Sequence, residues 1–339
     1  MAWKVLSLFS GMGGMDIGFS EEICVHRASV PVWWTSRPAD IHGFVYLRPL
    51  GFETVFQNDI LKEAQQIADL NGWSKNYVRR DIWELLAENY PFPAADVVTG
   101  GFPCQDFSHA GKRQGFNSER GTLYKAFVEV VKRVVPKVFV AENVEGLLTT
   151  EGAIQTILYD FTAAGYDVKH TLIKCENYGI PQTRHRVIII GVRKDLKLDW
   201  TLELENGNRQ VSLRSYFEHL AEPEESTDPA QQRYSKAAKL EKGQGQKAVD
   251  LDLPGPTMRA EHHGNIEYRR HGAGERRLTV REAALIQTFP PDCRLTVGLT
   301  AYKPIGNAVP PLLGYLVARL VRHLLTKAAD LVHPPLVRV

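Results

Sequence analysis

The sequence has few cysteines, and none of them stands in a metal-binding pattern. Cys24, Cys104, Cys175 and Cys293 are far apart, and no CxxC or Cys/His pair of the zinc-binding kind is present. We therefore expect no metal site. An intracellular, reduced protein is also expected, in which any thiol chemistry is catalytic rather than bridging.

Long apolar runs and repeats are also lacking. No apolar stretch approaches the length of a membrane span, so we expect no membrane partner. The N-terminal residues MAWKVLSLFSG are typical of a strand and a glycine turn, not of a signal peptide. The composition, with 44% hydrophobic and 24% charged residues, is typical of a soluble globular protein. Together with the separated cysteines, this leads us to expect a cytoplasmic protein.

Net charge is only +2, but its distribution is uneven. Residues 201–230 hold seven acidic and two basic side chains, whereas residues 259–281 hold six arginines, three glutamates and three histidines. The second stretch could follow a phosphate backbone, or it could be an ordinary solvated face.

Short apolar runs alternate with amphipathic stretches over the first 195 residues. Strands are predicted at 4–9, 53–58, 95–100, 137–143, 167–175 and 186–192, and helices at 60–70, 121–135, 151–164, 279–288 and 308–326. This alternation predicts a Rossmann-like α/β fold, a mostly parallel sheet with helices on both faces. We expect it to span residues 1–195, completed by 276–330. Residues 196–275 should form a smaller irregular domain, and 331–339 a tail.

Residues 24–50 interrupt the step from the first helix to the second strand. The segment is rich in proline, tryptophan and arginine. It could be a lid, a nucleic-acid contact or a surface insertion, and a surface insertion is the default expectation.

A glycine turn follows the first strand. Gly11, Gly13 and Gly14 allow a sharp turn and a close approach to a ligand. The spacing GxGG lacks the dinucleotide pattern GxGxxG with an acid about 20 residues on. Asp59 ends the strand at 53–58, and Asp81, in RRDIW, is expected to end a further strand, the third along the chain. The two could bind a ribose and an exocyclic amine, with Ile82 packed on the ring. They could also cap helices. Ribose and adenine contacts without a pyrophosphate site suggest S-adenosylmethionine.

Cys104 ends the expected fourth strand, at the sheet edge where ligands bind in α/β proteins. Taken alone it could equally be a buried, inert cysteine. Glu142 and Asn143 end the neighbouring strand and would point into the same crevice. Arg184 and Arg186 alternate along the last strand and would face one way, unless they form a surface salt-bridged pair.

Six blocks of this sequence resemble those of DNA (cytosine-5)-methyltransferases, in the same order. They are FSGMGG, GGFPCQDFS, AENVEGL, QTRHRVIIIG, RRLTVREAALIQTFP and AYKPIGNAVPPLLG. The likeness extends from residue 4 to about 325, except for 24–50 and 200–255. The bacterial restriction–modification type is the most similar, because no long regulatory N-terminal region precedes the first block.

The resemblance implies methylation of cytosine carbon 5 in a short double-stranded DNA sequence. Cys104 would add to carbon 6 of a flipped-out base, Glu142 would hydrogen-bond N3 and the amine, and Arg186 would contact O2. Arg184 would support the pocket electrostatically, and Asn143 would orient Glu142 or the Cys104 loop. The S-adenosylmethionine site would comprise Phe9, Ser10, Gly11, Gly13, Asp59, Ile60, Asp81, Ile82 and Asn307. An alternative for Asn307 is the N-cap of helix 308–326.

DNA contacts are expected from two segments. The resemblance implies backbone or orphan-base contacts from Gln105 and Ser108, and a phosphate or base contact from Thr257. Further candidates in the smaller, target-recognition domain are Arg259, His262, His263, Arg269 and Arg270, since arginine to guanine is the commonest specific pairing.

Other interpretations stay open at this point. A tRNA cytosine methyltransferase has a similar catalytic sequence, although PCQDFS favours DNA. A catalytically inactive DNA-binding regulator is a different class, against which the set of Cys104, Glu142 and Arg186 argues. The protein is expected to act as a monomer, with a cognate restriction endonuclease as a separate partner.

Overall fold

In the central strands, neighbouring side chains are buried on opposite faces of one sheet. Val5, Val138 and Ile188 belong to one apolar cluster, whereas the next residues in each strand belong to another: Leu6, Phe139 and Ile189. Strands buried on both faces are what a mostly parallel sheet with two helical layers requires. The α/β fold inferred from the sequence is therefore confirmed.

The computed structural model describes residues 2–103, 123–205, 207–236, 248–260, 268–271, 274–296 and 298–332, with the backbone alone at 268–271, 274 and 332. The described strands are β1 (Trp3–Leu8), β2 (Cys24–His26), β3 (Thr35–Pro38), β4 (Phe44–Leu47), β5 (Phe52–Asp59), β6 (Tyr77–Arg79), β7 (Val97–Gly100), β8 (Val138–Val144), β9 (Tyr166–Lys174), β10 (His185–Arg193), β11 (Tyr268–His271) and β12 (Gly274–Arg277). The described α-helices are α1 (Gly14–Ser20), α2 (Lys62–Leu70), α3 (Ile82–Ala87), α4 (Leu123–Val134), α5 (Gly146–Thr149), α6 (Ala153–Ala163), α7 (Leu213–Phe217), α8 (Val280–Ile286), α9 (Tyr302–Asn307) and α10 (Pro311–Val332).

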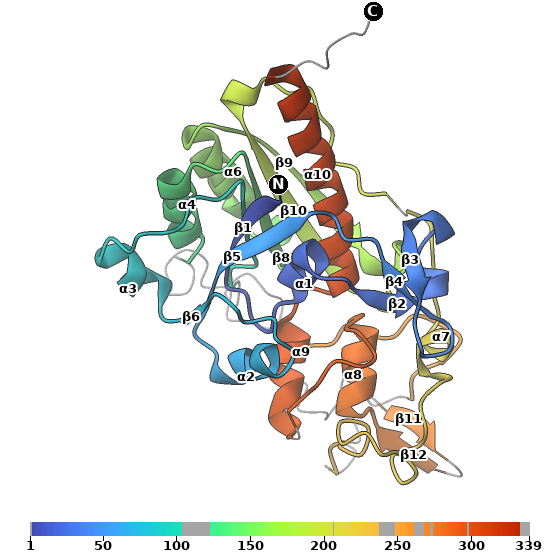
Figure 1. The fold of residues 1–339 in the computed structure, drawn as a ribbon. Helices are drawn as coiled ribbons and strands as arrows, with labels where there is room; N and C mark the ends of the chain where they lie inside the picture. The colour runs from blue at the N-terminus through green and yellow to red at the C-terminus, as the bar shows by residue number, and fades with distance from the viewer. Residues whose placement is uncertain are drawn as a thin grey trace, which may run out of the picture.

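The main sheet has the order β6-β5-β1-β7-β8-β10-β9. Strands β6, β5, β1, β7 and β8 pair in parallel, and β10 runs antiparallel to both of its neighbours. Because β10 is reversed, its start lies at the same edge as the carboxyl ends of the parallel strands. Helices α3, α4 and α6 contribute to the cluster on one face, and α1, α2 and α10 to the cluster on the other (Figure 1).

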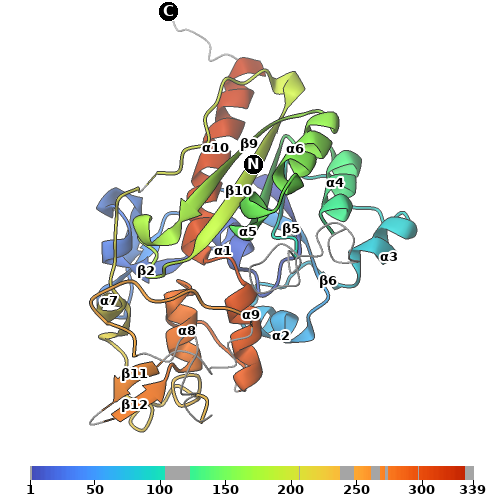
Figure 2. The same ribbon diagram turned by 180° about the vertical axis from the view of Figure 1, so that it is seen from behind.

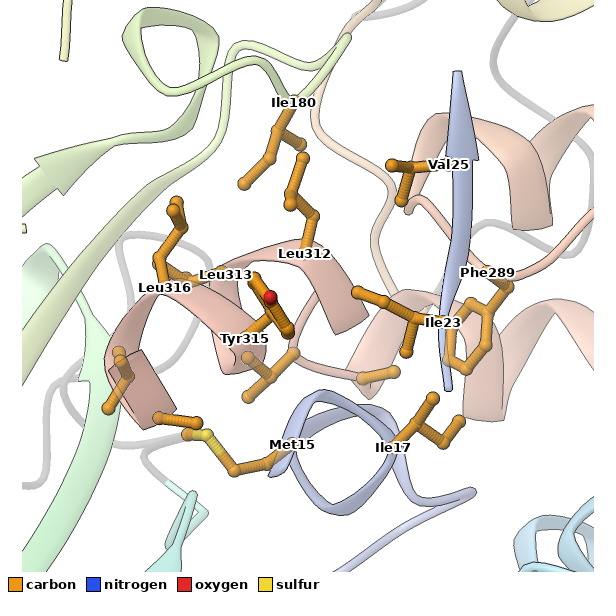
Figure 3. Close-up of a cluster of buried hydrophobic side chains, with 14 of the residues drawn as sticks. Met15, Ile17, Ile23, Val25, Ile180, Phe289, Leu312, Leu313, Tyr315 and Leu316 are labelled. Carbon is orange, nitrogen blue, oxygen red and sulfur yellow. The ribbon is translucent and has the colours of Figure 1, made fainter. Parts of the chain in front are cut away.

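The helical stretch Leu299–Leu331, which includes α9 and most of α10, is long and apolar enough to cross a membrane, but 78% of its apolar window is buried inside the protein, as in a core helix. Helix α10 packs along α1 at close range. A Cβ atom on Gly18 would lie 2.4 Å from the Tyr315 backbone nitrogen, so glycine is required at this crossing. Figure 3 shows the result, with Met15 and Ile17 of α1 facing Leu312, Tyr315 and neighbouring residues.

Residues 24–50 form a three-stranded antiparallel sheet in the order β2-β4-β3. Figure 2 shows, from behind, that α8, α9 and the β11–β12 hairpin lie together below the main sheet, while α10 rises beside it. The domain boundaries at 195 and 276 stay predictions.

Candidate active site

The predicted site residues gather at one edge of the main sheet. The strand order places the ends of β6, β5 and β1 side by side, followed by the ends of β7 and β8 and the start of β10. This edge is where open α/β sheets bind ligands. The end of β1 at Leu8 and the start of β10 at His185, 177 residues apart in the sequence, are thereby brought to one edge.

The glycine turn after β1 is held in an uncommon conformation. Phe9 has φ +53°, a left-handed value that side chains other than glycine rarely adopt, and Gly11 and Gly13 have φ +54° and +92°. Strain of this kind clusters at ligand sites. A Cβ atom on Gly11 would meet nothing within 4 Å, so the turn is open on that side.

The end of β5 fixes this turn. Ser10 exchanges hydrogen bonds with Asn58, and the Gly11 N–H donates to Asp59 Oδ2 at 2.8 Å. Asp59 Oδ1 accepts from the N–H groups of Ile60 and Leu61. Burial raises the pKa of Asp59, and its three N–H donors oppose that rise.

Two isoleucines predicted for the cofactor site have opposite environments. Ile60 is 62% exposed beside Asp59, whereas Ile82 is 2% exposed and packs in the core. The Ile82 side chain therefore offers little surface to a ligand, and Ile60 is the available apolar group. Asp81 is the N-cap of α3, since its carboxylate accepts from the Trp83 N–H at 2.7 Å.

The C-terminal segment lies beside the turn, as the sequence predicted. A Cβ atom on Gly14 would fall 2.0 Å from the Val309 carbonyl oxygen, so the two backbones touch. Asn307 is exposed at the end of α9. The alternative interpretation of Asn307 as a helix N-cap is wrong, because α10 begins only at Pro311.

A carboxylate and an arginine meet at the centre of the edge. Glu142 near the end of β8 is 8% exposed, and its Oε1 lies 2.7 Å from Arg186 Nε. Gly101, one residue past β7, faces the same carboxylate, since a Cβ there would be 2.8 Å from Glu142 Oε2. The pair therefore lies at the sheet edge, and the absence of a side chain at Gly101 leaves room for the carboxylate.

Asn143 anchors the segment that leads to Cys104. Its Nδ2 donates to the Phe102 carbonyl oxygen at 3.3 Å, in a buried position. Whether Asn143 also orients the Cys104 loop stays a prediction, because the contact shown ends at Phe102. Cys104, Gln105 and Ser108 themselves lie outside the described residues.

Arg184 has different neighbours from Arg186. It precedes β10, is 1% exposed, and its guanidinium donates to the carbonyl oxygens of Met258, Gly306 and Ala308. Burial and the nearby Arg186 charge lower the pKa of Arg184 to about 9. The two arginines are near each other, but only Arg186 contacts Glu142.

The recognition candidates are only partly described. Thr257 donates its hydroxyl to the Thr183 carbonyl oxygen at 2.7 Å. The backbone of Arg259 touches Gly306 so closely that a Cβ atom on that glycine would lie 2.2 Å from the Arg259 carbonyl oxygen. Arg269 and Arg270 belong to β11, and His262 and His263 lie outside the described residues.

Three further residues of this edge escaped the sequence analysis. Gly101 makes room for Glu142, Tyr77 contacts the glycine turn, and Gln182 hydrogen-bonds Met258 and Gln287. The two consecutive glycines before Phe102 could have indicated that Gly101 makes room for a neighbouring group. The other two depend on long-range contacts that no local pattern shows.

Known proteins resemble this chain over most of its length. A family model described as C-5 cytosine-specific DNA methylase matches residues 3–323. Type II methyltransferase M.BsuRI of Bacillus subtilis is 33% identical, over 93% of this chain and 78% of its own length. Type II methyltransferase M.NgoPII of Neisseria gonorrhoeae is 30% identical over 96% of both chains.

Solved structures support the fold. The chain resembles the S. pombe Dnmt2 methyltransferase with a TM-score of 0.65 and 19% identity, covering 95% of this chain and 99% of that one. It also resembles the Entamoeba histolytica methyltransferase EhMeth, with a TM-score of 0.66 and 16% identity over 96% and 99%.

Proposed function

Because the chain belongs to the C-5 cytosine-specific DNA methylase family, we propose that it methylates one cytosine within a short double-stranded DNA sequence, with S-adenosylmethionine as the methyl donor. Within that family it is a DNA (cytosine-5-)-methyltransferase of the Type II restriction–modification kind. The observation that carries this proposal is the buried Glu142–Arg186 pair at the sheet edge. It faces the segment that leads directly into Cys104.

The residues around the glycine turn fit S-adenosylmethionine. The Gly11 side is open, Ile60 presents an exposed apolar side chain, and the Asp59 carboxylate lies between them. When bound, the donor supplies an electrophilic methyl group. The residues we propose to hold it are Phe9, Ser10, Gly11, Gly13, Asp59, Ile60, Asp81 and Asn307. Ile82, whose side chain is buried in the core, is not among them.

The protein's part in the chemistry is to make carbon 5 of cytosine nucleophilic. The Cys104 sulfur forms a bond to carbon 6, and the electron pair of the C5–C6 double bond moves toward carbon 5. Glu142 hydrogen-bonds N3 and the exocyclic amine, and Arg186 holds Glu142 while facing O2. After methylation a base removes the carbon 5 proton, and the C6–S bond breaks to restore the double bond and the thiolate.

The target base must leave the helix stack, because carbon 6 is inaccessible inside a duplex. We assign the vacated space to the segment with Gln105 and Ser108. Reading of the sequence falls to Thr257, Arg259, His262, His263, Arg269 and Arg270. The enzyme acts as a monomer in the cytoplasm, with a restriction endonuclease of the same specificity as a separate partner.

Covalent trapping tests the proposal. Duplex DNA with 5-fluorocytosine at the target position, incubated with S-adenosylmethionine, should give a complex that survives denaturant, because fluorine cannot leave as a proton does. Cys104→Ala should abolish the complex, and Glu142→Gln should reduce it strongly. Glu151→Gln, at an exposed position, is the matched control.

The substrate class is tested by transfer of labelled methyl groups to DNA and to tRNA. We expect incorporation into DNA alone, and bisulfite sequencing then gives the modified cytosine. Label in tRNA alone, or turnover that survives Cys104→Ala, would contradict the assignment.

A further inference from the structure

Tyr77 is the first residue of β6, two strands from the glycine turn. Its side chain spans the end of β5, and its hydroxyl donates a hydrogen bond of 3.0 Å to the Gly11 carbonyl oxygen. The hydroxyl of a half-buried tyrosine thus serves one backbone group of the proposed donor site.

Gly11 is held from both sides. Its N–H donates to Asp59 of β5, and its carbonyl oxygen accepts from Tyr77 of β6, so the two peptide groups that flank Gly11 are both fixed. Left-handed φ values are easily adopted by glycine, but glycine also populates several alternatives about equally. External contacts must therefore select the observed conformation.

Tyr77 is suited to be a permanent donor. Burial and the negative charges of Asp59, Asp16 and Asp69 raise its pKa above the ordinary value, while Arg79 opposes the rise. The hydroxyl therefore stays protonated at neutral pH and is available as a donor. Asp59, in contrast, holds the turn only as an acceptor.

We propose that Tyr77 is a positioning residue for the methyl donor, which orders the turn at Gly11 before the donor arrives. The proposal rests on the function proposed above, in which this turn binds S-adenosylmethionine. A site ordered in advance binds more tightly, because less conformational freedom is lost on binding. Tyr77 contacts the turn and not the reacting atoms, so we expect its loss to change the Kd for the donor rather than kcat.

Tyr77→Phe removes the hydroxyl and keeps the ring. We expect the Kd for S-adenosylmethionine and for its demethylated product to rise about three- to tenfold, the usual worth of one hydrogen bond. The value of kcat at saturating donor, and the Kd for DNA, should change less than about twofold. Amide hydrogen exchange in the segment that contains Gly11 should be faster in the variant without donor.

Tyr166→Phe is the matched control. Its hydroxyl also donates to a backbone carbonyl oxygen, that of Pro136 at 2.8 Å, near the far edge of the sheet. Both variants and the wild type are compared by calorimetric titration with donor and product, and by thermal melting.

An unchanged donor Kd in Tyr77→Phe would overturn the proposal, and so would an equal loss of affinity in Tyr166→Phe, which would indicate general loosening. Failure of the proposed function appears differently: the wild type itself would then bind neither donor nor product.

Discussion

At Gly101 the presence of a single hydrogen in place of a side chain leaves room for the Glu142 carboxylate. A Cβ atom there would lie 2.8 Å from Glu142 Oε2, closer than side chains approach in proteins. Glu142 is already held on its other side by Arg186. A methyl group at Gly101 would therefore push on the carboxylate and disturb its contact with Arg186.

Gly101→Ala should consequently lower kcat by about 10²-fold, because a displacement near 1 Å of a catalytic group has effects of that size. Affinity for DNA and for the methyl donor should stay within about twofold. Gly207→Ala is the control, since a Cβ there has its nearest contact at 3.9 Å. Steady-state kinetics decide the matter, and full activity of Gly101→Ala would contradict the role given to Glu142.

Asp16 is a buried carboxyl group in the first turn of α1. Its Oδ2 accepts from Gln57 Nε2, and burial raises its pKa from 3.8 to about 6. The unfolded chain loses this proton near pH 4 and the folded one only near pH 6. The contribution of Asp16 to stability therefore falls as pH rises between these values, by about 3 kcal/mol at 1.36 kcal/mol per pH unit.

Asp16→Asn should remove this pH dependence, because an amide does not ionise. We expect the variant to unfold at a higher urea concentration than wild type at pH 7.5, and the difference to shrink toward pH 4. Asp40→Asn, at an exposed position, should leave the curve unchanged. A difference in urea midpoint between Asp16→Asn and wild type that does not vary with pH would refute this account of Asp16.

At the scale of elements, residues 24–50 are a packed sheet rather than the surface insertion expected by default. Phe44 is 2% exposed and lies edge-on to Tyr216 and His219 of the segment that follows the main sheet. Ser29 and Tyr216 share a hydrogen bond of 2.7 Å. The insertion therefore joins the segment around α7 to the catalytic body.

Phe44→Ala should destabilise the protein by about 3–5 kcal/mol, as for other large-to-small changes in a core. Trp33→Ala, on the same insertion but at a 71% exposed position, should cost less than about 0.5 kcal/mol. Urea denaturation of the two variants measures both values. Similar small losses would mean that the insertion is peripheral after all.

At the scale of the whole molecule, one fully buried glutamine connects three distant segments. Gln182 Oε1 accepts from the Met258 N–H at 2.8 Å, and its Nε2 donates to Gln287 Oε1 at 2.8 Å. Arg184, two residues on, binds the Met258 and Ala308 carbonyl oxygens. The start of β10, with Arg186, is thereby fixed relative to the proposed recognition residues.

Gln182→Leu keeps the volume but leaves buried polar partners unsatisfied, which should cost about 2–4 kcal/mol. The ratio of specific to non-specific DNA affinity should also fall, since Thr257 and Arg259 would lose their fixed relation to β10. Melting curves and competition binding measure the two effects. Gln232→Leu, which breaks an exposed hydrogen bond to Ser226, is the control, and an equal effect there would contradict this role.

The sequence by itself determined the order of strands and helices and the polar groups at the strand ends. Alternating apolar residues and glycine turns act locally, and parallel strands must bring their carboxyl ends to one edge, so Asp59 and Glu142 were predictable at the same edge of the sheet. Only the tertiary structure decided which groups touch. Arg186 rather than Arg184 meets Glu142, and Tyr77 reaches Gly11. Ile82 packs in the core, whereas Ile60 is exposed. Such contacts depend on packing between segments that are far apart in the sequence, and no local sequence pattern predicts them.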